Sequence, residues 1–392
     1  MKTLLRMLLG RLPLGWVQLC FSRPRLIAAV GGVTFANVLI LMQLGFMNAL
    51  FETSVMTHRK LHGDLFLTSA DFRTLREASP MPRVRMYEAL SVPGVVRAIP
   101  IYLGTLLWTD PATGDTTNFR VIGVPTSEPV FTDLSIQKQL APLSSADTAI
   151  LDRRMRDFPK RIAAAVSANG VFPLEMQGRR MRVVGLFDQG AAFDVDGNLI
   201  VSDQTFLRLF PNRQSGTPSI VALELAAGVD PTTAHAALRE RFPESDVRVF
   251  VKDEWIAAEQ AYQARQTPIG FVFGFGTVMG LVVGLVIVYQ VLSTDVQDHL
   301  AEYATLKAIG YPPRYFSGII LEEALELSAL GFVPGLLISL GLYALAANAT
   351  ALPISMPWTR PLLVFGLTAA MCTVSGWIAT RRLQAADPAD LF

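Results

Sequence analysis

Four long stretches without a charged side chain constrain this chain more than any other feature of its sequence. They cover residues 26–50, 266–294, 327–359 and 361–380. Each is long enough to cross the hydrocarbon layer of a bilayer, which takes about 20 apolar helical residues. Because lipid offers the backbone no hydrogen-bond partner, such stretches cross as α-helices. The sequence therefore predicts a membrane protein with four transmembrane helices.

The segment between the first two stretches has the composition of a soluble domain. Residues 51–267 contain 24 Lys and Arg and 25 Asp and Glu, whereas only 17% of the whole chain is charged. A segment of this length can bury its own core, as one domain or as two small lobes. Its near-neutral charge gives no indication of nucleic-acid binding.

Basic residues near the ends of the spans predict the orientation, because they favour the cytoplasmic side. They are Lys2, Arg6, Arg11, Arg23 and Arg25 before the first span, Lys307 and Arg314 after the second, and Arg381 and Arg382 after the fourth. Both termini are therefore expected in the cytoplasm and residues 51–267 outside. In chain order, the predicted parts are an N-terminal segment with an interfacial helix (1–25), transmembrane helix 1 (26–50), the external domain with stalk helices (51–267), transmembrane helix 2 (268–293), a cytoplasmic connecting helix (294–314), transmembrane helix 3 (315–347), an external loop (348–360), transmembrane helix 4 (361–380) and a cytoplasmic tail (381–392).

Short alternating segments and helical segments are mixed in the external domain, which predicts an α+β fold. Predicted strands cover 64–67, 99–108, 119–124, 182–187, 199–201, 220–225 and 247–251, and predicted helices cover 81–90, 232–242 and 255–264. Asp230 and Pro231 are the expected start of the second helix. The last helix is expected to run nearly straight into the second span, and residues 52–61 to extend the first, so that two helices form a stalk.

Two sets of residues within the predicted spans are candidates for a special role. Gly276, Gly280 and Gly284 recur every four residues on one helix face, which favours close packing against a helix of this subunit or of a second copy. Glu322, Glu323 and Glu326 fall in the first turns of the third span. Ionisable side chains at this depth either mediate coupling or substrate contact, or pair with a basic residue such as Arg314 at headgroup depth.

The sequence shows no catalytic constellation, no GxSxG elbow and no phosphate-binding loop. His58 and His62 are four residues apart without a metal-binding pattern, and we interpret them as stalk surface. We therefore expect a non-catalytic subunit with no cofactor of its own. If a nucleotide drives this protein, another chain binds it.

The connection between spans two and three carries the most specific motif. Residues 296–309 predict an amphipathic helix, with Gly310 as its C-terminal stop and Pro312 beyond it. The sequence from Glu302 to Gly310, EYATLKAIG, resembles the segment that precedes span three in FtsX-like ABC permeases of the MacB/LolC/FtsX group. The C-terminal DPADL at 387–391 and the order of one span, a large external domain and three spans are also similar to that group.

A narrower resemblance links the chain to the DevC branch of these permeases, on residues 35–36, 42–51 and 63–67. The resemblance implies a MacB/FtsX-like permease fold in a bacterial inner membrane, with the large α+β domain in the periplasm. It also implies that the segment around 302–310 is a coupling helix that docks on a separate ABC ATPase of the DevA or MacB type, where ATP binds. Carried over by position, the expected contact residues are Glu302, Thr305, Leu306, Lys307 and Gly310.

The resemblance implies two alternative functions. The first is an exporter permease, acting as a homodimer with a DevB-like membrane fusion protein and an outer-membrane channel, for a lipid or another hydrophobic or amphiphilic cargo. The second is an FtsX-like regulator that transmits ATPase motion to a periplasmic partner without moving cargo. A membrane enzyme is a third class, which the missing constellation disfavours. Nothing in residues 51–267 selects a cargo.

Overall fold

The computed structural model describes residues 14–300, 302, 305–306 and 309–385. They form two compact units. The helical unit comprises the described residues up to Asn48, Phe271–Leu345 and the described residues from Ile354 onward, and the sheet unit comprises Ala49–Gly270 and Ala346–Pro353.

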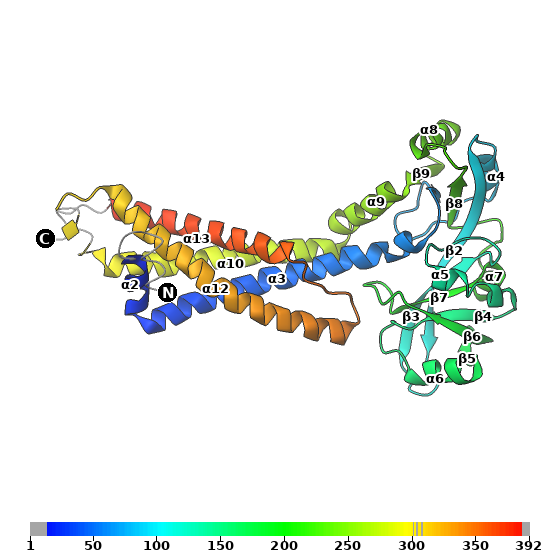
Figure 1. The fold of residues 1–392 in the computed structure, drawn as a ribbon, viewed down its shortest axis with the longest axis horizontal. Coiled ribbons are helices and arrows are strands. Elements are labelled where there is room, and N and C mark those ends of the chain that lie inside the picture. The colour runs from blue at the N-terminus through cyan, green and yellow to red at the C-terminus, as the bar shows by residue number, and fades with distance from the viewer. Residues whose placement is uncertain (1–13, 301, 303–304, 307–308, 386–392) are drawn as a thin grey trace. The chain divides into compact units, whose positions relative to one another are not determined.

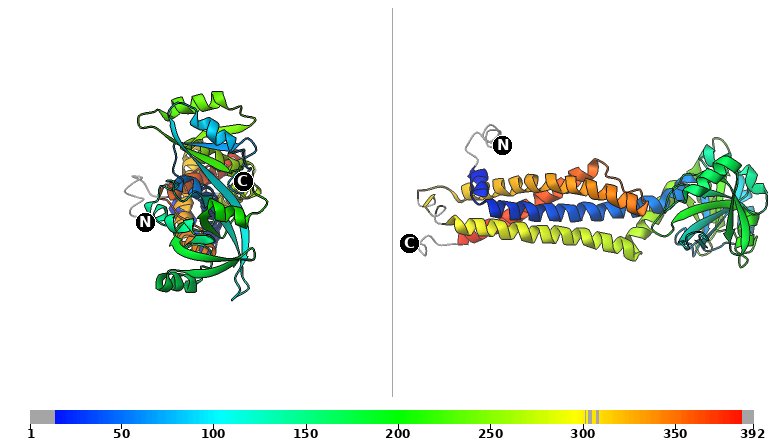
Figure 2. Two further views of the ribbon diagram at one scale, coloured as in Figure 1. Left: turned by 90° about the vertical axis from the view of Figure 1, so that its right-hand side faces the viewer. Right: turned by 90° about the horizontal axis from the view of Figure 1, so that it is seen from below.

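Four long helices lie side by side in the helical unit (Figures 1 and 2). They are α3 (Arg23–Lys60), α10 (Pro268–Asp298), α12 (Pro313–Thr350) and α13 (Thr359–Ala385), preceded by the short α2 (Leu14–Phe21). Each of the four has a segment long and apolar enough to cross a membrane. The predicted number of spanning helices is therefore confirmed for the part of the chain that the structure describes.

Helix α3 continues without a break beyond the first predicted span, which confirms that residues 52–60 extend it. The second predicted stalk helix differs from expectation. Helix α9 (Lys252–Arg265) ends before α10 begins, so the prediction of a nearly straight run was wrong. Pro268 cannot donate a backbone hydrogen bond, and Thr267 Oγ1 accepts one from Gly270 N at 3.2 Å, which caps a new helix there.

The helix predicted over 296–309 also begins differently. Helix α10 continues to Asp298, and Val296 is buried against its apolar neighbours. The backbone N of His299 still donates to the carbonyl oxygen of Asp295 at 3.1 Å, and a turn at His299 follows the end of α10. The second span and the connecting helix are thus separated by a turn, because burial of Val296 keeps it in the longer helix.

A mixed nine-stranded sheet forms the other unit, in the order β5-β6-β4-β7-β3-β2-β8-β1-β9. Only the β3–β7 and β4–β6 pairs among these strands are parallel. The strands are β1 (Leu65–Ser69), β2 (Val95–Thr109), β3 (Thr116–Val124), β4 (Thr148–Asp152), β5 (Phe172–Met176), β6 (Arg179–Phe187), β7 (Gly197–Ser202), β8 (Ile220–Leu225) and β9 (Val247–Val251). The helices of this unit, besides α9, are α4 (Val84–Leu90), α5 (Leu134–Gln137), α6 (Lys160–Asn169), α7 (Asp203–Leu209) and α8 (Pro231–Arg241), with a 3-10 turn at Ala141–Ser144. The predicted α+β class is confirmed.

Long strand β2 joins the two halves of this sheet, because it pairs with β3 on one side and with β8 on the other. Buried aromatic and aliphatic side chains pack on both halves. On one half, Phe206 of α7 lies over Gly123 of β3, where a Cβ atom would come within 2.5 Å of the Phe206 Cβ. On the other, Trp255 of α9 packs on Phe66 of β1 with their ring centroids 4.7 Å apart. The sheet thereby fixes the position of α9.

Candidate functional site

The connecting segment after α10 holds the predicted ATPase-contact residues. Glu302, Thr305 and Leu306 are helical, and the first two are exposed. Leu306 is partly buried against the cluster of Phe316 and Ile319 at the start of α12. Lys307, the fourth candidate, lies outside the described residues.

Gly310 ends this segment with a left-handed backbone, at a φ of +105°. The amide of Tyr311 donates to the carbonyl of Leu306 at 3.2 Å, which is the long hydrogen bond of a Schellman motif. A glycine tolerates this φ without a side-chain clash. The motif EYATLKAIG therefore ends in glycine for a local geometric reason, whatever the helix binds.

The three candidate glycines of α10 lie against neighbouring helices of the same chain. A Cβ on Gly276 would meet Gln43 of α3 at 2.5 Å, and one on Gly280 would meet Ile40 at 2.9 Å. At Gly284 it would meet both α3 and Met371 of α13. These contacts favour packing within one subunit over the alternative of a second copy.

The three candidate glutamates of α12 are buried, at 9%, 0% and 8% exposure for Glu322, Glu323 and Glu326. Among the described residues, neither carboxylate oxygen of Glu323 or Glu326 has a hydrogen-bond donor. Glu323 lines a small cavity that Asp295 and Arg25 also line. The side chain of Arg314 is not described, so its predicted pairing with these carboxylates stays a prediction.

Arg25 joins the start of α3 to the end of α10. Its guanidinium pairs with Asp295 at 3.1 Å and with Asp298. The Arg25 side chain is 28% exposed and that of Asp298 is 50% exposed. Solvent therefore reaches this pair, which we name the Arg25 junction.

At the other end of α3, its last turns pack on α9 within the sheet unit. His58 is fully buried, its ring centroid lies 4.1 Å from that of Trp255, and its Nε2 lies 3.7 Å from Glu259 Oε2. Lys252 Nζ donates to the carbonyl of Leu61 at 2.8 Å and so holds the C-terminal end of α3. We name the contact of His58, Trp255 and Glu259 the His58 junction. The interpretation of His58 as stalk surface was wrong.

Strand β3 contributes a buried cation beside this junction. Arg120 is 3% exposed, forms an ion pair with Asp194 and lies 3.5 Å from Thr57 Oγ1 of α3. Gln189 donates to the same hydroxyl at 2.8 Å. The end of α3 is thereby hydrogen-bonded to two parts of the sheet unit.

Burial sets the protonation of the His58 junction. It raises the pKa of the Glu259 carboxyl to about 7, against the lowering effect of the Gln263 hydrogen bond. It lowers the pKa of His58 to about 3, and the charge of Arg120 acts in the same direction. Both shifts favour the neutral forms of His58 and Glu259 over an ion pair at this site.

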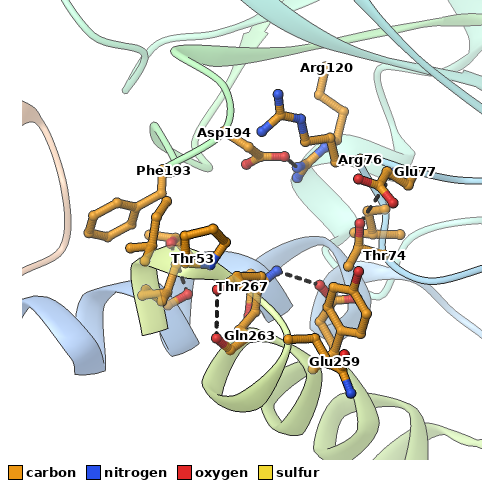
Figure 3. Close-up of a pocket in the computed structure, with 17 residues that line it drawn as sticks. Thr53, Thr74, Arg76, Glu77, Arg120, Phe193, Asp194, Glu259, Gln263 and Thr267 are labelled. Carbon is orange, nitrogen blue, oxygen red and sulfur yellow. Dashed lines mark hydrogen bonds and ion pairs between the residues drawn. The ribbon is translucent and has the colours of Figure 1, made fainter. Parts of the chain in front are cut away.

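A pocket of about 230 Å³ opens beside the junction, between the end of α3 and α9 (Figure 3). Arg120 and Asp194 lie on one side, and Glu259 and Gln263 of α9, with Thr267 just after it, lie on the other. Gln263 donates to Glu259 at 3.0 Å. None of these pocket residues was predicted from the sequence, since the partners come from segments far apart in the chain.

Two family models match the chain. One, described as MacB-like periplasmic core domain, matches residues 26–241, which is more than half of the chain. The other, described as FtsX-like permease C-terminal, matches residues 274–388. Together they run from the first predicted span to the last.

Relatives with similar sequences are ABC transporter permeases. An uncharacterized ABC transporter permease of Mycobacterium bovis is 23% identical over 379 residues, which cover 95% of this chain and 96% of that protein. One from Mycobacterium tuberculosis is 23% identical over 80% of this chain and 79% of that protein. The pyoverdine export ATP-binding/permease protein PvdT of Pseudomonas putida is 25% identical over 62% of this chain, but over only 38% of its own length.

Two solved domains of transporters match about half of this chain with low TM-scores. The periplasmic region of MacB from Actinobacillus actinomycetemcomitans is 13% identical, with a TM-score of 0.31, over 49% of this chain and 89% of that domain. The extracellular domain of the transporter YknZ from Gram-positive bacteria is 13% identical, with a TM-score of 0.32, over 48% of this chain and 98% of that domain.

Proposed function

The chain belongs to the family of permeases with a MacB-like periplasmic core domain, and we propose that it couples ATP hydrolysis by a separate ATPase to export of an amphiphilic cargo. ATP would bind to the partner and not to this chain. The sheet unit would lie in the periplasm and both termini in the cytoplasm, as the basic residues near the spans indicate.

The observation that carries this proposal is the helical segment after α10. Glu302 and Thr305 are exposed there, and Gly310 ends the segment with a Schellman motif. An exposed helix between two spans can be held by a groove in a cytoplasmic partner. We propose that the ATPase binds this segment and that its closure moves α10.

Helix α3 provides a route for that motion. It is a single 38-residue helix that continues from the first predicted span to the His58 junction. Since Arg25 ties its start to the end of α10, a displacement of α10 would also displace α3. The sheet unit would then act on cargo that reaches it from the periplasm or the outer leaflet.

The proposed assembly is a homodimer of this chain with two ATPase subunits. By resemblance to the DevC branch, a DevB-like membrane fusion protein and an outer-membrane channel would receive the cargo. The alternative, an FtsX-like regulator of a periplasmic partner, uses the same coupling segment. Cross-linking of the sheet unit in cells separates the two, since an exporter captures a membrane fusion protein and a regulator captures a hydrolase.

The coupling step is tested with Lys307→Glu and Leu306→Asp in the full chain. Both should reduce the amount of ATPase that co-purifies with the permease by about tenfold, the effect of losing about 1.4 kcal/mol of binding free energy. The matched control is Arg241→Glu, a charge reversal at an exposed position of α8. Wild-type amounts of ATPase with both coupling variants would contradict the docking role.

A further inference from the structure

A second cavity of the sheet unit lies between α9 and the edge strand β9, apart from the coupling segment. Its volume is about 400 Å³, within the range of small-molecule sites. Its lining includes four aromatic side chains, which we call the aromatic wall, namely Phe72, Phe250, Trp255 and Tyr262. We name it the α9–β9 cavity.

Two guanidinium groups stand at this aromatic wall. Arg73 follows β1, and Arg248 lies on β9 two residues before Phe250, on the same face of the strand. Both are exposed, and neither has an acidic partner among the residues that the structure describes. The cavity therefore has two arginine side chains that no carboxylate of the described residues neutralises.

Trp255 is the most buried of these aromatic side chains. This side chain is 2% exposed, and its Nε1 has no hydrogen-bond partner among the described residues. Buried indole N–H groups ordinarily have a partner, since leaving one unpaired costs free energy. Phe72 packs beside it, with the ring centroids 6.2 Å apart.

Glu259 is the one acidic side chain that lines this cavity within the described part of the chain. It is turned toward His58 and Gln263, with which its oxygens make their contacts. Because burial raises its pKa to about 7, it carries little negative charge in slightly acidic solution. Its carboxyl therefore opposes an anion in the cavity only weakly.

We propose that the α9–β9 cavity binds a small aromatic anion, whose ring packs on the aromatic wall and whose carboxylate or sulfonate group is held by Arg73 and Arg248. Guanidinium groups bind such planar anions through two parallel hydrogen bonds and also stack on aromatic rings. This binding site does not depend on the proposed transport role, because it needs no ATPase.

The test is calorimetric titration of the full chain in lipid nanodiscs with 2-naphthoate, with empty nanodiscs as reference. The neutral isostere 2-naphthamide is titrated in parallel. We expect saturable binding of one naphthoate per chain, weakened about tenfold or more in the Arg73→Ala/Arg248→Ala variant, because two charge-assisted hydrogen bonds are lost.

Controls separate this site from general anion or ring binding. Arg241→Ala removes an exposed arginine of the same unit and should leave naphthoate affinity unchanged. Naphthamide should bind more weakly than naphthoate and be insensitive to the double arginine substitution. Equal naphthoate affinity in wild type and the double variant, absence of saturable binding, or displacement of naphthoate by an equal concentration of inorganic phosphate would each overturn the proposal. Unchanged hydrogen exchange of α9 in the variants shows that the fold is kept.

Discussion

The two ends of α3 are held by different kinds of contact. The Arg25 junction is a solvent-accessible group of charges, in which Asp298 is half exposed. The His58 junction is buried and contains an imidazole whose pKa is lowered to about 3 and a carboxyl group whose pKa is raised to about 7. Salt weakens the first kind of contact by screening its charges. The second kind responds to pH, because its two groups have shifted pKa values. The two ends of α3 should therefore respond to different conditions, one to salt and the other to pH.

Removing the buried cation next to the His58 junction should have the largest effect. Arg120→Ala leaves Asp194 without its ion-pair partner and removes a side chain that is almost fully buried. We expect the free energy of local opening of α9 and the end of α3 to fall by about 3 kcal/mol, as for other buried pairs broken on one side. Hydrogen exchange of these amides measures it. Arg153→Ala, which breaks an exposed pair, is the control and should change it by less than about 1 kcal/mol.

The proton balance of the His58 junction gives the second prediction. Glu259 has a raised pKa, so its contribution to stability is present at low pH and is lost as pH rises from about 4.5 to about 7. His58 has a lowered pKa, so its contribution is present above about 6.5 and is lost as pH falls toward 3. Between about pH 4.5 and 6.5 the two effects of pH on stability cancel. Folding there moves one proton from the imidazole to the carboxyl group, and the total number of bound protons stays the same.

Single substitutions should reveal the pH dependence of stability that each group contributes. In that pH window, local stability of Glu259→Gln should rise with pH by about 1.4 kcal/mol per unit, and that of His58→Gln should fall equally steeply. The measurement is hydrogen exchange of α9, corrected for the intrinsic exchange rate at each pH. A wild-type profile that slopes as steeply as either variant would contradict the neutral pair.

The Arg25 junction should give the smallest effect. Asp298→Asn removes one of the two carboxylates of Arg25, and we expect a loss of at most about 1 kcal/mol in the opening free energy of the last turn of α10. The loss should shrink as the salt concentration rises from about 0.01 to 1 M. Over this range the screening length falls from about 30 Å to about 3 Å, so that salt weakens the attraction between the two charges. The same salt change should leave the exchange of α9 unaffected, which provides a control within the molecule. A salt-independent loss would show that the junction is not accessible to ions.

Local sequence patterns predicted those elements whose cause is local. The four spans follow from the uncharged stretches, and β8 and β9 were predicted with their observed bounds, because alternation or β-branched residues mark them. The start of α8 was predicted from Asp230, whose side chain accepts from Thr232 N. The end of the connecting segment followed from Gly310.

Elements whose cause lies elsewhere in the chain were missed. Strand β4 is buried at every residue, because it is paired on both sides, and so it shows no alternation. Helix α7 has only seven residues, which are too few to show a helical period of apolar residues. Its Phe206 is buried. The environment of His58 is made by Trp255 and Glu259, about 200 residues later in the sequence, which no local pattern contains.

The interruption at Thr267 and Pro268 makes the two helical connections of the sheet unit, α3 and the α9–α10 pair, unequal in stiffness. Helix α3 keeps its backbone hydrogen-bond ladder from Arg23 to Lys60, whereas the ladder between α9 and α10 is broken and restarted. Helices bend most easily where a proline removes a ladder bond. Under the proposed coupling, axial strain would pass through α3, and torsion would be absorbed beside Pro268.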